Sequence, residues 1–259
     1  VVFANGDDPV FTDFKKTVAE YNLTPREAVE TLPMNPKTLG VVGRIGRATA
    51  PPPDAARFKP PPADHVSIIS AAVPIHPDTC LDEGKTLHGG SLRHKHASWI
   101  GGHTGLTRTL TTYIENLLMV LGYMAISPAT APYGEQNWER AGKTYRTSIS
   151  NWSERHIAAA CGLGTFGLHG QIITPKGAAV YLFSVVTDLE LTPTPRTSGK
   201  ENCLFFRDKS CKQCIDHCQG GAISEHGSDP YKCHEYAINT VTRATKSNIS
   251  LGRFDKYER

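Results

Sequence analysis

The sequence lacks any run of about eighteen apolar residues, which argues against a membrane-spanning helix. It also lacks a large excess of charge of one sign: its 259 residues carry a formal net charge of +3, too little to favour nucleic-acid binding. No secretory signal precedes the short, acidic start, and there is no initiating methionine. We therefore expect a cytoplasmic protein without a membrane span, trimmed in this sequence at either end.

The composition that remains is typical of a globular protein. Hydrophobic residues make up 39% of the chain and charged residues 20%. The length suffices for one large domain or two modest ones.

Cysteine is concentrated in one part of the chain. Five of the seven cysteines fall within about thirty residues, and these are Cys203, Cys211, Cys214, Cys218 and Cys233. The middle three have the spacing C-x2-C-x3-C and are followed by Ala222-Ile223, which is most of the ferredoxin run C-x2-C-x2-C-x3-C-P. Such spacing lets one loop wrap a compact cluster, so it predicts a [4Fe–4S] site. Two positions depart from the run: Asp208 replaces its first cysteine and Gln219 its proline.

The same cysteines allow other interpretations. Four thiolates at short spacing also suit tetrahedral zinc, although zinc ribbons usually show two separated C-x2-C pairs. Disulfides are a third interpretation, but nothing else in the chain is typical of a secreted protein. The isolated Cys80 and Cys161 predict small buried hydrophobic side chains.

The ligand sets also stay open at this point. If there are two clusters, Cys211 and Cys214 share the first with Asp208 or Cys203, and the two later cysteines belong to the second. An aspartate ligand would be unusual beside soft thiolates. If there is one cluster, the simplest four ligands are Cys203, Cys211, Cys214 and Cys218.

The first sixty residues predict helices and an arm. Helical spacing of apolar residues from Phe11 to Tyr21 predicts one helix. The capping box at 24–27, with Pro25 at the first helical position, predicts the start of a second, short helix. The Pro-rich stretch 50–62 predicts a stiff linker or wrapping arm.

The middle of the chain alternates between strands, helices and loops. The apolar run 66–73 predicts a strand buried on both faces. Residues 76–103, with five histidines, predict a mobile or substrate-facing loop, and residues 123 to about 147 predict another loop. A helix is expected from Gly105 to its C-cap at Gly122. Its expected core face consists of Leu106, Leu110, Ile114, Leu117, Leu118 and Leu121.

A glycine-rich turn follows a predicted helix at 153–161. Its letters Gly162-x-Gly164-x-x-Gly167 match the dinucleotide fingerprint, which must follow a strand and open a helix. Here the order is reversed, because strands are predicted at 172–175 and 180–188. We therefore predict no nicotinamide site, but a turn whose backbone approaches a planar or charged group. The candidate cofactor-binding residues are Gly162, Gly164, Thr165, Phe166 and Gly167.

These motifs together resemble a known family. In order, the chain contains E-R-x5-C-G-L-G-x-F-G-x2-G-x-I-I-T-P-x-x-G, then V-V-T-D-L-x-L-x-P-T, then the cysteine run with A-I, then K-C-x-x-Y. Over roughly residues 64 to 240 this resembles the iron–sulfur half of epoxyqueuosine reductases and corrinoid-dependent reductive dehalogenases. The resemblance implies an α/β fold: a nitroreductase-like core at 64–195, which binds a corrinoid (cobalamin), and a ferredoxin-like module at 196–259. The N-terminal helical segment and arm occupy 1–63.

The resemblance also implies a function. The chain would be an oxidoreductase that passes electrons from a [4Fe–4S] cluster to a corrinoid or to a small-molecule substrate near residues 145–170. A ferredoxin- or flavodoxin-type protein would donate the electrons, and tRNA would be a partner if the chemistry is queuosine-related. The alternative is a non-catalytic metalloprotein, either an electron carrier or a zinc-stapled binding module.

The catalytic candidates lie just before the E-R pair. Epoxyqueuosine reductases place an acidic proton donor at the position that matches Ser148, and a serine cannot act as a carboxylic acid. Dehalogenases use a tyrosine with a nearby cation, and Tyr145 beside Arg146 fits that pattern, because a cation lowers the pKa of a phenol and stabilises the phenolate. The other interpretation of Tyr145 is a loop aromatic without a role.

Overall fold

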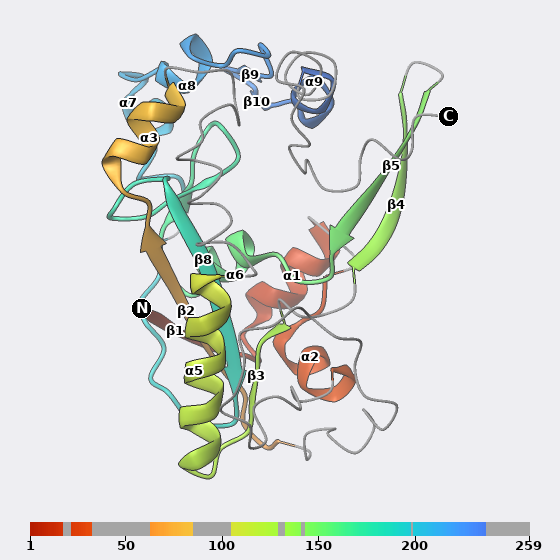
Figure 1. The fold of residues 1–259 in the computed structure, drawn as a ribbon, viewed down its shortest axis with the longest axis vertical. Coiled ribbons are helices and arrows are strands. Elements are labelled where there is room, and N and C mark those ends of the chain that lie inside the picture. The colour runs from red at the N-terminus through yellow and green to blue at the C-terminus, as the bar shows by residue number, and fades with distance from the viewer. Residues whose placement is uncertain are drawn as a thin grey trace.

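The computed structural model describes residues 1–17, 22–32, 63–84, 105–128, 133–140, 143–197 and 199–236. Its centre is a four-stranded antiparallel sheet in the order β1-β2-β8-β3 (Figure 1). The strands are β1 (Val2–Asn5), β2 (Ser67–Pro74), β8 (Val180–Thr187) and β3 (Ala125–Ile126). Helices pack on both faces of this sheet, so the predicted mixed α/β class is confirmed.

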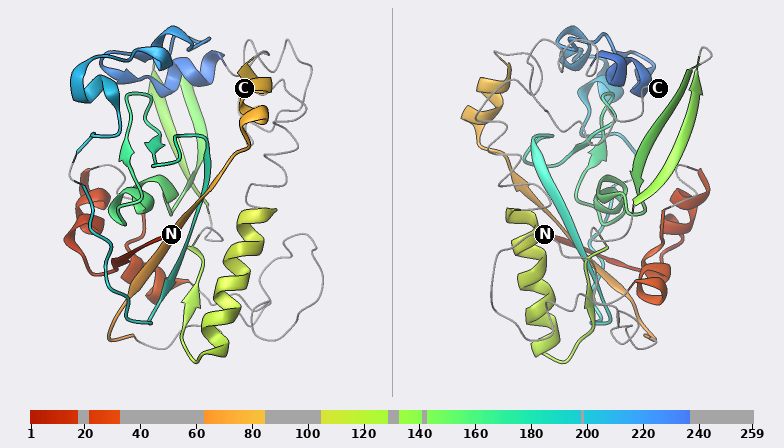
Figure 2. Two further views of the ribbon diagram at one scale, coloured as in Figure 1. Left: turned by 90° about the vertical axis from the view of Figure 1, so that its left-hand side faces the viewer. Right: turned by 45° about the vertical axis from the view of Figure 1, so that its right-hand side comes forward.

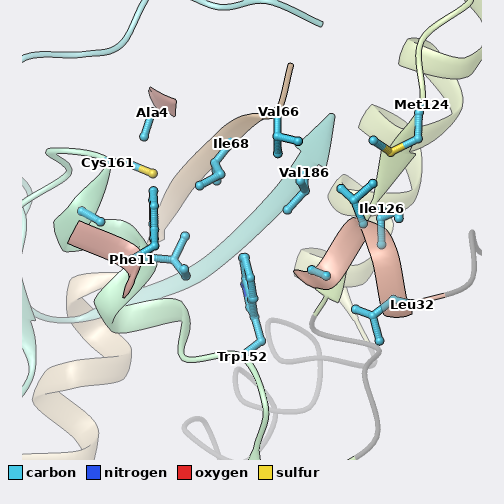
Figure 3. Close-up of a cluster of buried hydrophobic side chains, with 14 residues drawn as sticks. Ala4, Phe11, Leu32, Val66, Ile68, Met124, Ile126, Trp152, Cys161 and Val186 are labelled. Carbon is cyan, nitrogen blue, oxygen red and sulfur yellow. The ribbon is translucent and has the colours of Figure 1, made fainter. Parts of the chain in front are cut away.

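The two faces of the sheet carry different helices. Ile68 and Val186 face a large core formed with α1 (Pro9–Thr17), α2 (Pro25–Thr31) and α6 (Glu154–Ala160). The neighbouring Ile69 and Val185 face the opposite side, where α5 (Leu106–Val120) packs. Figure 2 shows the sheet between these helices, and Figure 3 shows the larger core. Because β2 lies between two strands and is covered on both sides, the predicted doubly buried strand is confirmed.

The N-terminal residues belong to this same core. Phe11 of α1, Val29 of α2 and Ala4 of β1 all lie in the cluster with Ile68 and Val186. Both predicted helices are confirmed over the described residues, but β1 was not predicted. The segment expected to stand apart at 1–63 thus completes the core of the sheet, and its Pro-rich arm at 50–62 lies outside the described residues.

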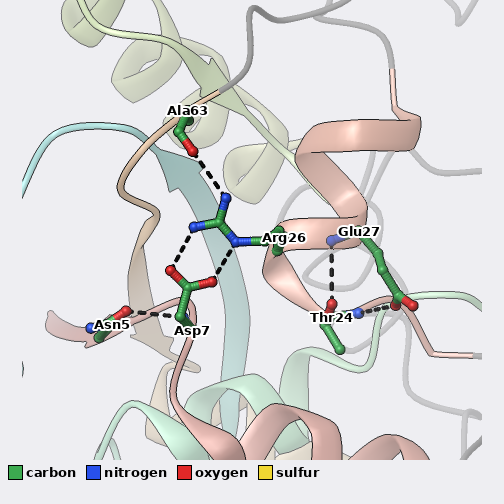
Figure 4. A network of polar contacts seen from close by, with 6 residues as sticks. All are labelled: Asn5, Asp7, Thr24, Arg26, Glu27 and Ala63. Carbon is green, nitrogen blue, oxygen red and sulfur yellow. Dashed lines mark hydrogen bonds and ion pairs between the residues drawn. The ribbon is translucent and has the colours of Figure 1, made fainter.

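The start of α2 shows why a local signal was sufficient there. Thr24 Oγ1 accepts from the Glu27 N–H at 3.2 Å, and the Glu27 carboxylate accepts from the Thr24 N–H at 2.8 Å, which completes the capping box (Figure 4). Arg26 then forms two hydrogen bonds to the Asp7 carboxylate, at 2.5 and 2.6 Å, and a third to the Ala63 carbonyl. This arginine joins the turn after β1 to the chain that enters β2.

Helix α5 was predicted correctly as a helix, but its expected core face is buried only in part: Leu118 is buried and Ile114 packs against the same cluster. Its C-terminus is a Schellman motif, in which Gly122 has φ +91°, its N–H bonds to the Met119 carbonyl and the Tyr123 N–H bonds to the Leu118 carbonyl. The buried residues are Thr107, Thr111, Glu115 and Leu118. Three expected core residues are exposed: Leu106 (39%), Leu117 (45%) and Leu121 (61%).

A buried polar contact orients α5. Glu115 Oε1 accepts the N–H of Ser127, just after β3, at 2.6 Å, and burial raises the pKa of this carboxyl to about 7. Leu118 packs on Ala125 and Val185 from the same side of the helix. The carboxylate must face β3 to satisfy that amide, so the leucines on the opposite face of the helix point outward.

Two predicted loops contain regular structure. Residues 77–84, in the histidine-rich segment, form α3 (Pro77–Gly84), and Cys80 on it is exposed rather than buried. The histidines at 88, 94, 96 and 103 lie outside the described residues. The second loop contains a hairpin, β4 (Tyr133–Arg140) and β5 (Lys143–Ser150), paired in register along all eight residues of each strand. A single two-residue connection at 141–142 joins these strands, and such short connections favour hairpins.

None of the helices in the described part of the chain combines the length and the apolar character needed to cross a bilayer.

Candidate functional site

The cysteine segment lies at one end of the molecule, beyond the top of the sheet (Figure 1). It consists of α7 (Leu204–Asp208), α8 (Gln213–Asp216), a short hairpin of β9 (Ile223–Ser224) and β10 (Gly227–Ser228), and α9 (Pro230–Tyr236). Three of the predicted cysteines belong to these helices or cap them. Cys203 is the N-cap of α7, Cys214 lies in α8, and Cys233 lies in α9.

Three of the cysteines are electrostatic neighbours. Burial raises the pKa of the Cys214 thiol, and nearby Cys203 and Cys211 raise it further, because a second thiolate close by disfavours the first. The nearby backbone of Cys214 and Ile215 opposes this shift of the pKa. Cys203 is also buried, with 7% of its surface exposed. The structure thus groups Cys203, Cys211 and Cys214.

The two later cysteines form a second group. Burial raises the pKa of the Cys233 thiol, and the neighbouring Cys218 adds to that shift. The Cys218 sulfur accepts a hydrogen bond from the Ala222 N–H at 3.2 Å. This amide belongs to the Ala222-Ile223 pair that marks the ferredoxin-like run. That these two groups are the ligand sets of two clusters stays a prediction.

Asp208 is engaged elsewhere. Its carboxylate accepts from the Ser210 N–H at 3.0 Å and from Arg207 Nε at 3.1 Å, and these bonds lower the pKa of its carboxyl. Cys203, by contrast, lies beside Cys214. Of the two residues that could have been the third ligand with Cys211 and Cys214, the structure therefore favours Cys203.

The donor chemistry of the first group suits an iron–sulfur cluster. Its three potential donors are soft thiols, and the apolar side chains of Leu168, Phe205, Ile215 and Ile223 pack around it. Across the ranges that the structure describes, no three His, Cys, Asp or Glu side chains form a group that could hold a metal ion. The cysteines would supply thiolate ligands to a cluster, whose chemistry is one-electron transfer.

The glycine-rich turn contacts this cysteine segment directly. It follows α6 and opens β6 (Thr165–Phe166), which pairs with β7 (Ile172–Ile173), so the predicted order of helix, turn and strand is confirmed. Thr165 Oγ1 accepts the Asn202 N–H at 3.0 Å, next to Cys203. Leu168, 2% exposed, packs against Cys203 and Phe205. The turn is therefore the contact between the α/β core and the cysteines.

The glycines of the turn are required by contacts within the protein. A Cβ on Gly164 would lie 2.2 Å from the Ile173 carbonyl oxygen, and one on Gly162, at φ +82°, would lie 2.9 Å from the Pro195 carbonyl oxygen. A Cβ on Gly167 would lie 2.8 Å from Ile173 Cδ1. These close approaches are to protein atoms, so they give no support to a corrinoid at this turn. That Gly162, Gly164, Thr165, Phe166 and Gly167 bind a cofactor stays a prediction.

An aromatic contact lies beside the turn. The His156 ring packs between Phe14 and Phe166, with centroid distances of 5.3 and 5.0 Å. Ser153 Oγ lies 2.7 Å from His156 Nδ1. Burial, aided by Arg155, lowers the pKa of His156 to about 4, so this ring is neutral at neutral pH.

The three catalytic candidates lie on β5, and the strand separates them. The described backbone pairs Tyr145 with Trp138, Arg146 with Asn137, and Ser148 with Glu135. Successive positions of a strand fall on opposite faces, so Tyr145 lies on one face of the hairpin and Arg146 and Ser148 on the other. Arg146 therefore lies on the opposite face of the hairpin from Tyr145. The tyrosine–cation hypothesis places the two side chains close together. The side chains of these residues lie outside what the structure describes.

Sequence reasoning missed an acidic side chain at the start of α6. Glu154 is partly buried with its Oε1 atom shielded from solvent, and its Oε2 accepts a hydrogen bond from Ser184 Oγ at 2.7 Å. Ser184 Oγ in turn accepts from Trp152 Nε1 at 2.9 Å. Burial raises the pKa of Glu154 to about 7, and the bond from Ser184 opposes that shift. The E-R pair marked this position, but only the fold brings Ser184 to it.

Comparison with known proteins gives one sequence match and several distant structural ones. No protein-family model matches the chain. Over 90 residues the chain is 32% identical to an epoxyqueuosine reductase of Bacillus anthracis, a stretch that covers 34% of this chain and 22% of that protein. This match confirms the resemblance to epoxyqueuosine reductases. It gives no support to the reductive dehalogenases.

Solved structures of epoxyqueuosine reductases align over most of this chain at low scores. The enzyme from Bacillus subtilis has a TM-score of 0.44 and 16% identity, and the alignment covers 95% of this chain and 56% of that one. A second, determined with an epoxyqueuosine-modified tRNA-Tyr stem loop, has a TM-score of 0.44 and 17% identity over 91% of this chain and 52% of that one. This chain thus spans little more than half the length of these structures, and scores below 0.5 do not establish a shared fold.

Proposed function

We propose that this chain is part of an iron–sulfur reductase that acts on epoxyqueuosine in tRNA. The observation that supports this most is the contact between Cys203, the glycine-rich turn and its neighbour Leu168, which joins a thiol-rich site to the α/β core. The sequence match to an epoxyqueuosine reductase names the substrate class. In this proposal residues 64–195 form a nitroreductase-like core and residues 196–259 a ferredoxin-like module.

The cysteines would hold the electron-transfer group. In the proposal Cys203, Cys211 and Cys214 are ligands of one [4Fe–4S] cluster, and Cys218 and Cys233 contribute to a second. A cluster bound there accepts and donates electrons one at a time, and a ferredoxin- or flavodoxin-type protein would supply them. The amide of Ala222 already points at the Cys218 sulfur, and such bonds favour the thiolate over the thiol.

The core would hold the substrate near the hairpin and the glycine-rich turn. Reductive removal of an epoxide oxygen as water consumes two electrons and two protons, so the site needs a proton donor. His156 is neutral, and its pKa of about 4 leaves it unprotonated at neutral pH. We assign the donor role to Tyr145, on the hairpin face opposite Arg146 and Ser148, because a tyrosine hydroxyl can act as a general acid.

The proposal also includes a corrinoid as the cofactor of the core, which is a more specific assignment than the iron–sulfur ligands. The glycines expected to approach such a planar cofactor are instead packed against Ile173 and Pro195. A pink preparation would indicate a bound corrinoid, independently of the cysteines.

The test begins with protein purified without oxygen. A brown colour with equimolar iron and inorganic sulfide, lost in Cys214→Ser and kept in Cys80→Ser, supports the iron–sulfur assignment. A tRNA stem loop that carries epoxyqueuosine is then offered with a chemical reductant, and its conversion is followed by mass spectrometry. Colourless protein that contains zinc and no sulfide would contradict the proposal and favour a zinc-stapled binding module. Brown protein that never converts the stem loop would favour an electron carrier.

A further inference from the structure

The side chains of Trp152, Ser184 and Glu154 form a hydrogen-bonded chain with a defined direction. An indole N–H can only donate, so Ser184 Oγ must accept from Trp152 Nε1. The single hydroxyl proton of Ser184 is then free to point at Glu154, and the 2.7 Å contact to Oε2 uses it. Oε2 is therefore an acceptor in this arrangement. Any proton that Glu154 carries is on its other oxygen, Oε1.

The environment of Glu154 Oε1 is unusual for a carboxylate oxygen. Glu154 Oε1 is buried and has no hydrogen-bond partner among the residues that the structure describes. Ser70 Oγ is buried and unpartnered in the same sense. Ser70 pairs directly with Ser184 across β2 and β8, so both serines lie on the sheet face that α6 covers. The two atoms are not hydrogen-bonded to each other, so a proton on Oε1 would reach the Ser70 hydroxyl only through a bridging water molecule.

No charge nearby compensates an ionised Glu154. Helix α6 packs against α1, β2, β7 and β8, and none of these forms an ion pair with Glu154 in the described structure. The titratable group that responds to its charge is Cys161, at the end of the same helix, whose thiol has its pKa raised by burial and then by Glu154. A buried carboxylate without a cation is costly, which favours the neutral acid.

Trp152 joins this chain to the candidate site. It follows Ser150, the last residue of β5, by two positions, and it is 2% exposed in the main core. The carbonyl of Asn151, between them, accepts the Leu23 N–H at 2.8 Å. The root of the hairpin that bears Tyr145 is therefore held at the core by the indole and by one backbone bond.

We propose that Glu154 is a positioning residue: as a neutral acid protonated on Oε1, it holds Trp152 through Ser184 and so fixes where β5 leaves the core. Loss of that proton places an uncompensated charge beneath the hairpin root, and the pocket relaxes toward water. For catalysis this inference rests on the proposed function, in which β5 carries the proton donor. The assignment of the proton to Glu154 Oε1 does not depend on the proposed function.

The experiment compares Glu154→Gln with Glu115→Gln in the full chain. Glu115 is the matched control, because it is also a buried carboxyl with a pKa raised to about 7 but hydrogen-bonds to Ser127 in a different cluster. Infrared difference spectra at neutral pH should show a protonated-carboxyl carbonyl band that Glu154→Gln removes. The Trp152 indole N–H should be protected from hydrogen exchange in both variants and should lose protection in Ser184→Ala.

The pH dependence of turnover on the tRNA stem loop separates a positioning role of Glu154 from a purely structural one, because a structural role would not change its alkaline limb. In the wild type and in Glu115→Gln, turnover should fall about tenfold for each pH unit above the ionisation of Glu154. In Glu154→Gln, which cannot ionise, the alkaline limb should be absent. An unchanged infrared band in Glu154→Gln, or an unchanged alkaline limb, would overturn the inference.

Separate measurements test the proposed function and the role of Glu154. If no variant converts the stem loop, the proposed function fails, while the infrared band and the indole exchange still decide the state of Glu154. If Glu154→Gln does not fold, Ser70→Ala is used instead. Removing the Ser70 hydroxyl, which lies on the same sheet face as Ser184, should then shift the infrared band, and no shift would count against the inference.

Discussion

Arg196 and Asp8 lie 188 positions apart in the sequence and form a two-point ion pair, with Nη1–Oδ2 at 2.7 Å and Nη2–Oδ1 at 3.1 Å. Two residues earlier, Thr194 exchanges hydrogen bonds with Phe3 of β1: the Thr194 N–H donates to the Phe3 carbonyl, and the Phe3 N–H donates to Thr194 Oγ1. The chain that leads into the cysteine segment is thereby fixed to the edge strand of the sheet.

Asp8→Asn should therefore lower stability slightly and in a salt-dependent way. The pair is partly exposed, so solvent screening limits its contribution to about 1 kcal/mol or less of the free energy of unfolding. Arg196 holds the pKa of the Asp8 carboxyl below its usual value, so the stabilisation is present above that usual value and is lost as pH falls through the lowered one. Urea unfolding at low and high salt measures the effect. Asp13→Asn, which removes an exposed carboxyl later in α1, is the control, and an equal loss there would show that the ion pair contributes nothing.

Adjacent leucines of α5 should respond very differently to truncation. Leu118 is 5% exposed and packs on Ala125 and Val185, so Leu118→Ala should cost about 2–5 kcal/mol. Leu117 is 45% exposed, so Leu117→Ala should cost less than about 1 kcal/mol. Urea denaturation with a constant m-value measures both. Equal losses would mean that something covers the outer face of the helix.

These two leucines also show where sequence reasoning stops. The helical period, Gly122 and the capping box of α2 are local signals, and each produced the element that it predicted. Which side of α5 is buried depends on the Ser127 amide, which requires Glu115 to face inward against the hydrophobic pattern. The hairpin β4–β5 was missed because its strands are polar and were read as a loop.

The candidate site was likewise predictable from the sequence only where the signals are local. The spacing of the cysteines indicated which of them are neighbours, because short loops keep such residues together without help from the rest of the fold. The contact of Ser184 with Glu154 spans 30 positions and depends on α6 packing over β8, so no motif could show it. The glycines were recognised, but sequence could not tell a close approach to a cofactor from one to Ile173.

Glu115 should make stability depend on pH. Burial raises the pKa of its carboxyl to about 7 in the folded protein from an ordinary value of 4.5, so its contribution to stability is fully present below about pH 4.5 and is lost as pH rises through about 7. This difference in pKa corresponds to roughly 3 kcal/mol of the free energy of unfolding. Glu115→Gln should flatten this part of the curve, measured as the free energy of unfolding against pH. A curve that keeps its full slope in Glu115→Gln would show that this carboxyl is already ionised in the folded protein.

The ligand role of Cys203 can be separated from that of Asp208. Cys203→Ala should lower the iron and sulfide content and bleach the visible absorption, because Cys203 lies beside Cys214. Asp208→Asn should keep both, because the Asp208 carboxylate is occupied by Ser210 and Arg207 at the surface. Metal analysis of the two proteins, prepared in parallel without oxygen, gives the answer. Iron that is lost from Asp208→Asn and kept in Cys203→Ala would exchange the two roles.

The two faces of the β4–β5 hairpin can be told apart by one pair of substitutions. Tyr145 shares a face with Trp138, while Glu135 pairs with Ser148 on the other face, where the related enzymes place an acid. Tyr145→Phe removes only a hydroxyl, so it should leave iron content and stem-loop binding intact and lower turnover by about two orders of magnitude, the usual weight of general acid catalysis. Glu135→Gln removes the only carboxyl paired with Ser148 and should leave turnover within about threefold of wild type, if the substrate meets the Tyr145 face. Single-turnover rates on the tRNA stem loop measure both. The opposite outcome, in which Glu135→Gln is slow and Tyr145→Phe is not, would place the proton donor on β4. The donor would then be Glu135, which pairs with Ser148 and would supply the carboxyl that Ser148 lacks.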